Sequence, residues 1–109
     1  MLLSTTSQIP GHTITGYRGM VISQVTAGRH LGKDVLAGVR DVFGGRSKSL
    51  EKDLQAARKE ALNELASEAQ QMGANGVVGI RLDMENVGGS MLLFVGQGTA
   101  VTAIKGILE

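Results

Sequence analysis

The sequence predicts an α+β fold, in which a small, mainly antiparallel sheet is packed by one long and one short helix. Three observations support this prediction. Apolar side chains in residues 49–72 recur at steps of three or four residues, which is the period of an amphipathic helix. Within residues 77–85, Ile80, Leu82 and Met84 alternate with Arg81, Asp83 and Glu85, which is the two-residue period of a half-buried strand. Glycine-rich turns, Gly73-Ala74-Asn75-Gly76 and Gly88-Gly89, follow these two segments.

The N-terminal part of the chain is predicted to form two strands. Residues 2–5 form a short strand, and residues 14–26 form a much longer one. Gly16 and Gly19 lie inside the longer strand, where glycines usually mark a bulge or the close approach of another backbone. We therefore expect irregular pairing at these two positions.

The short helix is predicted over residues 34–43. Gly38 weakens this prediction by about 1 kcal/mol relative to Ala, and Gly44-Gly45 then breaks the chain. The expected buried side of the helix consists of Val35, Leu36, Val39, Val42 and Phe43.

The long helix over residues 49–72 has the clearest pattern in the chain. Its apolar stripe consists of Leu50, Leu54, Ala57, Ala61, Leu65, Ala69 and Met72, and Leu62 and Ala66 widen it. Ser47 or Ser49 is expected to cap its start, and Glu51 and Asp53 place negative charge where the helix dipole favours it. Gly73 supplies the left-handed residue that commonly follows a helix end.

The C-terminal part is predicted to be a β-hairpin. The strand over residues 77–85 leads into a hairpin loop at residues 86–90, and the last strand covers residues 91–104. Gly96-Gln97-Gly98 is expected to bend that strand. Because no linker, repeat or low-complexity tract divides the chain, residues 1–109 are predicted to form a single domain.

The composition excludes several classes of function. The formal net charge is +1, and Lys and Arg do not cluster, so we expect no nucleic-acid partner and no anionic membrane partner. The chain has no Cys, which excludes thiolate metal sites, disulfides and cysteine nucleophiles. Tyr17, Phe43 and Phe94 are the only aromatic residues, so the core must be aliphatic. This composition favours a thin subunit that gains burial by self-association with further copies of the same chain.

The sequence also predicts a location. Its first residues lack the basic region and the apolar run of a signal peptide. No apolar run approaches the roughly 20 residues that a membrane-spanning helix needs. We therefore expect a cytoplasmic protein.

Several short blocks resemble the bacterial YbjQ family, an uncharacterised family whose usual label is heavy-metal-binding, and the similarity covers essentially the whole chain. The blocks are Asp41-Val42-Phe43-Gly44-Gly45-Arg46-Ser47, Ala57-Arg58, Gly73-Ala74-Asn75-Gly76-Val77-Val78-Gly79 and Gly98-Thr99-Ala100-Val101. The resemblance implies a dodecin-like subunit that assembles as a ring, a homopentamer, and it implies no catalytic residues.

Two features depart from the family pattern. Residues 28–32 are atypical for the segment before the first helix, and Leu50 stands where family members often carry an aromatic residue. If that segment forms a subunit contact or a pocket, the ring geometry or the choice of ligand differs accordingly.

The first candidate site is the glycine-rich segment before the long helix. Exposed amides at a helix N-terminus, an Arg and a hydroxyl group together can hold a small anion. The spacing of a P-loop is absent. The alternative is a tight connection between the two helices, in which Ser47 caps the helix and Arg46 pairs with Asp41 or with a neighbouring subunit. The candidate ligand-binding residues are Arg40, Asp41, Gly44, Gly45, Arg46 and Ser47.

The second and third candidates are metal sites. Glu60, Glu64 and Glu68 are spaced by four, so they lie on one helical face, and hard cations prefer oxygen ligands. The alternative is an ordinary solvated face. His12 and His30 are each alone at local spacing, and they bind a metal only if ring symmetry brings copies together. The alternative is two ordinary loop histidines.

Soft metals prefer sulfur, which only the five methionines can offer, and Met20, Met84 and Met91 follow strand patterns that we interpret as core. No nucleophile–base pair is evident, so we expect that the protein is not an enzyme. The function we expect is a homo-oligomeric binding protein with a small anion or a metal ion at or near its subunit interfaces. The sequence identifies no cofactor, although the family label implies a metal ion. The alternative function is a structural or interaction scaffold without a small ligand.

Overall fold

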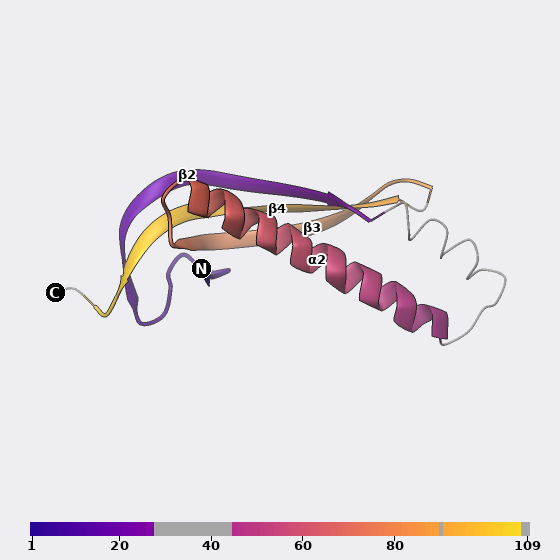
Figure 1. Ribbon diagram of the computed structural model, residues 1–109, viewed down its shortest axis with the longest axis horizontal. Helices are drawn as coiled ribbons and strands as arrows, with labels where there is room; N and C mark the ends of the chain where they lie inside the picture. The colour runs from indigo at the N-terminus through magenta and orange to yellow at the C-terminus, as the bar shows by residue number, and fades with distance from the viewer. Residues whose placement is uncertain (28–44, 90, 108–109) are drawn as a thin grey trace.

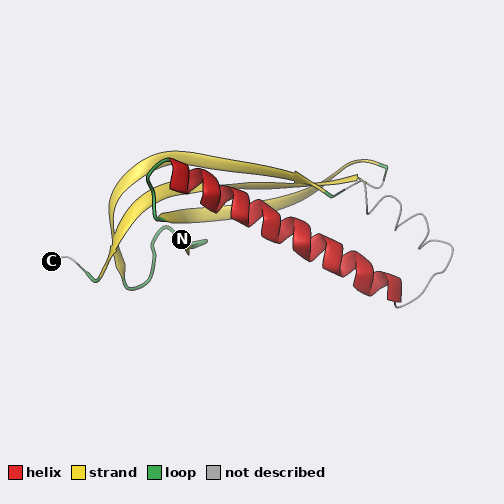
Figure 2. Cartoon of the chain, in the orientation of Figure 1, coloured by secondary structure: helices red, strands yellow, loops and turns green. Residues whose placement is uncertain are grey.

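The computed structural model describes residues 1–27, 45–89 and 91–107. Its elements are β1 (Leu2–Leu3), β2 (His12–Thr26), α2 (Gly45–Gln71), β3 (Gly76–Gly88) and β4 (Met91–Lys105). The predicted helix over residues 34–43 lies outside the described residues. The α+β class is confirmed by one long helix and one sheet (Figures 1 and 2).

The sheet has four strands in the order β1-β3-β4-β2. β1 runs parallel to β3, whereas the other neighbouring pairs are antiparallel, so the sheet is mixed and mainly antiparallel. β2 and β4 pair along almost their whole lengths. The register shifts twice in β2, between Ile14 and Gly16 and between Tyr17 and Gly19, which confirms the predicted bulges.

The bulge at Gly19 leaves room for the end of the helix. Gly19 has a φ of +126°, and the terminal methyl of Met72 lies 3.0 Å from the position that a Cβ would occupy there. A side chain at this position would be strained by its backbone conformation and crowded by Met72. Glycine is therefore required where β2 passes the C-terminal end of α2.

α2 packs across one face of the sheet, and its C-terminal half lies closest to the strands (Figure 1). The predicted apolar stripe is confirmed in this half. Ala57, Ala61, Leu65 and Ala69 are buried, and Leu54, Leu62 and Met72 are partly buried against the core. Leu65 is fully buried and packs with Val21, Val77 and Ala100 of the three long strands.

The ends of the helix were predicted with different success. Gly73 has a φ of +82°, which confirms the left-handed residue after the helix end. The start was predicted wrongly, because α2 already begins at Gly45 and residues 47 and 49 therefore lie inside its first turns. The apolar period revealed only where the helix meets the core, and the helix continues beyond that contact.

The hairpin between β3 and β4 is tighter than expected. The strands reach Gly88 and restart at Met91, so most of the predicted loop over residues 86–90 is strand. Gly88 and Gly89 both have positive φ angles, 130° and 57°, which lets the chain reverse within very few residues.

A second small cluster lies at the end of the sheet where β2 begins. Ile9 is buried there with Val78, Val101 and Ala103, and Leu2 and Ile14 pack against them. The loop before β2 therefore covers part of the sheet. Val77 and Ala100 pack under α2. Their chain neighbours Val78 and Val101 point to the other face of the sheet and belong to this second cluster.

The subunit is long and thin. Its principal extents are 61 × 23 × 17 Å and its radius of gyration is 17.3 Å, against about 13 Å for a compact chain of this length. Because of this shape, many large apolar side chains among the described residues are exposed. They are Met1, Leu3, Tyr17, Met20, Ile22, Met84, Val87, Met91, Ile104 and Ile107.

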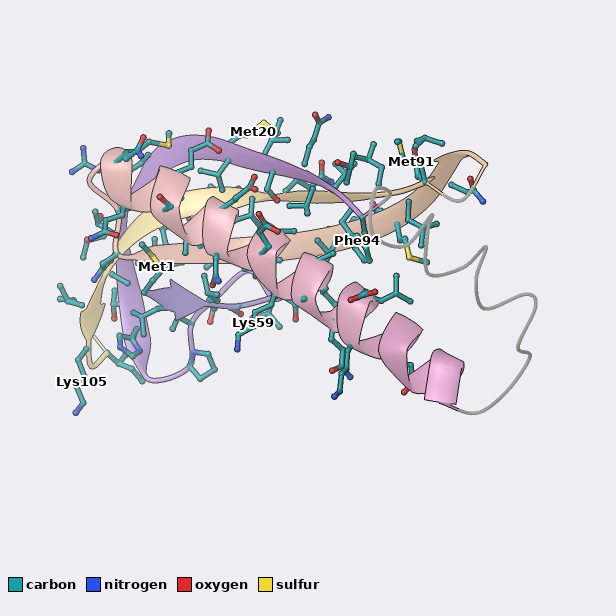
Figure 3. The ribbon with its side chains drawn as sticks, turned by 45° about the vertical axis from the view of Figure 1, so that its right-hand side comes forward. Met1, Met20, Lys59, Met91, Phe94 and Lys105 are labelled. Atoms are coloured by element: carbon teal, nitrogen blue, oxygen red, sulfur yellow. The ribbon has the colours of Figure 1, made fainter. Side chains whose placement is uncertain are left out.

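The interpretation of three methionines as core was wrong. Met20, Met84 and Met91 are 67%, 53% and 42% exposed. Met20 lies on the opposite side of the strands from α2, whereas Phe94 lies between β4 and α2 (Figure 3). A two-residue period identifies the two faces of a strand, but it does not tell whether a second layer covers a given face.

Asn75 connects the start of β3 to the end of β4. Its side-chain amide donates a hydrogen bond to the carbonyl oxygen of Ala103, and its side-chain carbonyl accepts one from the amide of Ala103, both at 2.8 Å. Its backbone amide also donates to the carbonyl oxygen of Val101 at 3.0 Å. The Asn75 side chain therefore pairs with β4 in the way that another strand residue would.

We expect Asn75→Ala to lower the free energy of unfolding by about 1–3 kcal/mol, because it leaves two backbone groups of Ala103 without their partner. Chemical denaturation at a fixed protein concentration measures this loss. Asn86→Ala is the matched control, because the Asn86 side chain accepts one exposed local bond from Gly88. Equal losses in the two variants would contradict the role assigned to Asn75.

Candidate functional site

The predicted anion site lies largely outside the described residues. Arg40, Asp41 and Gly44 are not described, and the described backbone of Gly45, Arg46 and Ser47 forms the first turn of α2. Amides in a first turn have no acceptor within the helix. The proposed gathering of these six residues around an anion stays a prediction.

The glutamate row lies on the surface of α2. Glu60, Glu64 and Glu68 are all exposed, and each precedes a buried residue of the helix stripe. Within the described part of the chain, no three His, Cys, Asp or Glu side chains come close enough to hold a metal ion. The described subunit therefore does not gather the glutamates into a metal site, and a solvated face accounts for them.

His12 lies at the first position of β2, at the mouth of a hollow of about 560 Å³. Its Nδ1 lies 2.9 Å from the carbonyl oxygen of Pro10. A carbonyl oxygen can only accept, so Nδ1 carries the proton, and in the neutral ring Nε2 remains an acceptor. A metal-binding His is usually oriented by such a bond. His30 lies outside the described residues, so the structure does not test a pairing of the two histidines.

Hydrogen bonds hold the loop around this hollow in one shape. The hydroxyls of Ser4 and Thr6 both donate to the carbonyl oxygen of Gln8, at 2.8 and 2.7 Å. The amide of Gly106 donates to the carbonyl oxygen of Gly11 at 2.8 Å, which ties the loop to the end of β4. Tyr17, Ile14 and Ile107 supply apolar walls to the hollow. It is an open, preformed surface that offers one imidazole nitrogen and several backbone groups.

A second hollow of about 280 Å³ lies between α2 and the β3-β4 hairpin. Its lining is mostly apolar, and the two charged residues Arg58 and Asp83 complete it. The apolar part consists of Leu54, Leu82, Met84 and Phe94. Sequence reasoning missed this hollow because its walls come from three separate elements, α2, β3 and β4.

Two polar groups in the described part of the protein are buried without a hydrogen-bond partner there. They are the hydroxyl of Ser23 and one carboxylate oxygen of Asp53. Ser23 faces Gly96, where a Cβ would lie 2.5 Å from its oxygen. The Ser23 hydroxyl thus fills the space that a side chain on β4 would need, which gives it a packing role.

In the described part of the chain, no helix is long and apolar enough to cross a membrane. This agrees with the absence of a long apolar run in the sequence.

The chain is similar to known proteins over nearly its whole length. The model of a family described as "YbjQ_1: Putative heavy-metal-binding" matches residues 1–104. A UPF0145 protein of Carboxydothermus hydrogenoformans is 45% identical over 101 residues, covering 93% of this chain and 94% of the relative. A UPF0145 protein of Actinobacillus pleuropneumoniae is 45% identical over 103 residues, covering 93% of this chain and 97% of the relative.

A solved structure has a similar fold. It is the crystal structure of a protein of unknown function of the DUF74 family from Pediococcus pentosaceus. Its TM-score is 0.54 at 17% sequence identity, and the match covers 95% of this chain and 98% of that one. At this identity, the likeness concerns the fold alone.

Proposed function

Because the chain belongs to the YbjQ family, as its sequence blocks indicated, we propose that it is a homo-oligomeric binding protein that holds a small anion or a metal ion at or near its subunit interfaces. The proposed assembly is a homopentameric ring of dodecin-like subunits. The description of the family as heavy-metal-binding favours a metal ion over an anion.

The observation that supports self-association best is the shape of the subunit. In the described part of the chain, α2 covers one face of the sheet, and Met20 and Ile22 on the opposite face are 67% and 53% exposed. Burial of apolar surface is favourable by roughly 25 cal/mol per Å². Contact between copies is therefore the direct way for this chain to enlarge a core that is small for its length.

The placement of the ligand near an interface is supported by the metal-ligand chemistry of the described residues. These residues contain no set of three metal-binding side chains within one subunit. Structural and catalytic metal sites need three or four protein ligands. A metal site that uses the Nε2 of His12, or the glutamates of α2, would need ligands beyond the described residues of one copy, and a neighbouring copy at an interface can supply them.

Native mass spectrometry of protein purified without added metal tests this proposal. We expect a ring, a homopentamer, that retains an extra mass in proportion to its subunits, and elemental analysis of the same sample identifies a bound metal. A monomer at micromolar concentration would contradict the assembly. An assembly with no extra mass, and no mass gained on titration with Zn²⁺ or inorganic phosphate, would contradict binding.

The second candidate function is a scaffold that assembles without a small ligand. It is favoured by the same lack of a complete metal-ligand set in the described subunit. In the native mass spectrum it predicts rings of protein mass alone. We further propose that the protein is cytoplasmic, is not an enzyme and has no nucleic-acid or membrane partner, as its composition suggests.

A further inference from the structure

Beyond the bulges, the sheet is a three-stranded ribbon with an outer edge on each side. β4 is its middle strand, where Gln97 lies opposite Ile22 of β2 and Arg81 of β3. β1 reaches only Gly76 and Val77 of β3. Within the described residues, no strand pairs with the outer edge of β2, or with the outer edge of β3 beyond Ile80. Both edges therefore present rows of unpaired backbone groups.

The edge of β2 lacks the features that usually prevent a strand from pairing with another chain. Between Gly19 and Ala27 the sequence contains no charged residue and no proline. Its two bulges lie earlier in the strand, at Gly16 and Gly19. Charges, prolines and bulges are the common means of protecting an exposed edge. This stretch therefore has the features of a strand that another strand covers.

The edge of β3 has a different character. Its residues on the sheet face opposite α2 are the charged side chains of Arg81, Asp83 and Glu85, and Arg81 contacts Asp83 at 3.3 Å. A copy of β3 laid beside β2 would bring the aliphatic stem of Arg81 next to the exposed Met20 and Ile22, while its charged head stays in water. The two edges therefore complement one another better than either complements itself.

The backbone hydrogen bonds show which amides of β2 point outward. The amide of Ala27 donates to the carbonyl oxygen of Leu92 on β4 at 2.8 Å. In an antiparallel pair, the direction of the amide alternates along the strand. The amides of Ile22, Gln24 and Thr26 consequently point away from β4.

The same reasoning applies to β3. The amide of Ile80 donates to the carbonyl oxygen of Ser4 at 3.1 Å, on the side away from β4. By alternation, the amides of Leu82, Met84 and Asn86 also point away from β4. Each subunit thus offers one set of outward amides on each edge, at the same height along the sheet.

We propose that the outer edge of β2, from Met20 to Thr26, pairs with the outer edge of β3 in a second copy of this chain, head to tail. This inference rests on the proposed homo-oligomer and names the contact that builds it. β2 and β3 are both antiparallel to β4, so they run in the same direction, and the added strand pair is parallel. One kind of contact then satisfies both edges of every copy, and repetition about an axis closes a ring. Pairing of β2 with another β2 would leave the β3 edge open.

Hydrogen exchange of the wild-type protein tests the pairing without any substitution. Native mass spectrometry first establishes whether the chain is assembled in the sample. In the assembly, we expect the outward amides of Ile22, Gln24 and Thr26 to exchange at least about tenfold more slowly than unstructured amides. The same slowing is expected for the outward amides of β3, those of Leu82, Met84 and Asn86.

The outcomes separate this inference from the proposed function. A monomeric wild-type chain contradicts the homo-oligomer, and the strand pairing with it. An assembled chain whose outward amides exchange freely on both edges overturns only the pairing. Slow exchange on β2 together with free exchange on β3 also overturns it, because β2 would then have a different partner.

A proline substitution provides a second test. Gln24→Pro removes an outward amide, and proline is tolerated on an edge strand when its nitrogen faces away from the sheet. We expect Gln24→Pro to dissociate the assembly into folded monomers, whereas the matched control Gln24→Ala stays assembled. A folded Gln24→Pro protein that remains assembled would overturn the pairing. If the variant does not fold, the exchange experiment on the wild-type protein decides.

Discussion

Replacement of Leu65 by Ala is expected to cost the protein about 3–4 kcal/mol of unfolding free energy. Leu65 is fully buried in the C-terminal half of α2, and it joins the helix to β2, β3 and β4 through Val21, Val77 and Ala100. Truncation of a buried leucine loses its transfer free energy and leaves a cavity. The neighbouring residues of the helix stripe, Ala61 and Ala69, have small side chains that cannot move in to fill the cavity.

Chemical denaturation followed by circular dichroism measures this loss. All variants must be compared at the same protein concentration, because the stability of an oligomer depends on it. Leu62→Ala is the matched control, since Leu62 is the same residue type less than one turn away and only partly buried. We expect it to lose clearly less than Leu65→Ala. If Leu65→Ala cost under 1 kcal/mol, the packing of α2 on the sheet would be wrong.

The second large effect is expected at Gly98 of β4. A Cβ on Gly98 would lie 2.6 Å from a methyl of Val77 and 3.2 Å from the carbonyl oxygen of Val78. Val77 is fully buried, so it has little freedom to move aside. Overpacking of this kind costs about 1–3 kcal/mol, and we expect Gly98→Ala to lie at the upper end of that range.

A double-mutant cycle identifies the cause of that loss. Val77→Ala removes the methyl groups that a new Cβ would meet, and it should also destabilise the protein by itself. We expect the double variant to be more stable than the sum of the two single losses predicts, by at least about 1 kcal/mol. Simple additivity would show that the contact with Val77 is not the reason for glycine at position 98.

The outcomes at the individual elements show how far local patterns reach. The long helix, the bulges at Gly16 and Gly19, and the left-handed residue at Gly73 were confirmed, because each depends on residues close together in the chain. The helix start and the interpretation of three methionines as core were wrong. A correct prediction of either feature would have required knowing which surfaces of the helix and the sheet face one another.

The candidate sites follow the same division. The spacing of the glutamates on α2 could be read from the sequence. The sequence could not show that, among the described residues, no three metal-binding side chains lie close together. The bond from His12 to Pro10 forms within three residues. The hollow, however, also requires Tyr17 and Ile107, which the pairing of β2 with β4 brings to the same end of the sheet. No periodicity in the sequence predicts that Tyr17 and Ile107 lie beside the same hollow.

By itself, the sequence determined the α+β class, the period of each element and the family, since these follow from side-chain spacing and short blocks of residues. Only the tertiary structure decided that β1 joins β3 in parallel. Only it decided that, among the residues it describes, no helix covers one sheet face and no strand pairs with two of the strand edges. The reason is physical: a pattern specifies which side of an element is apolar, while burial depends on what lies opposite that side. For this thin subunit, another copy of the chain is proposed to supply the strand that pairs with each of those edges.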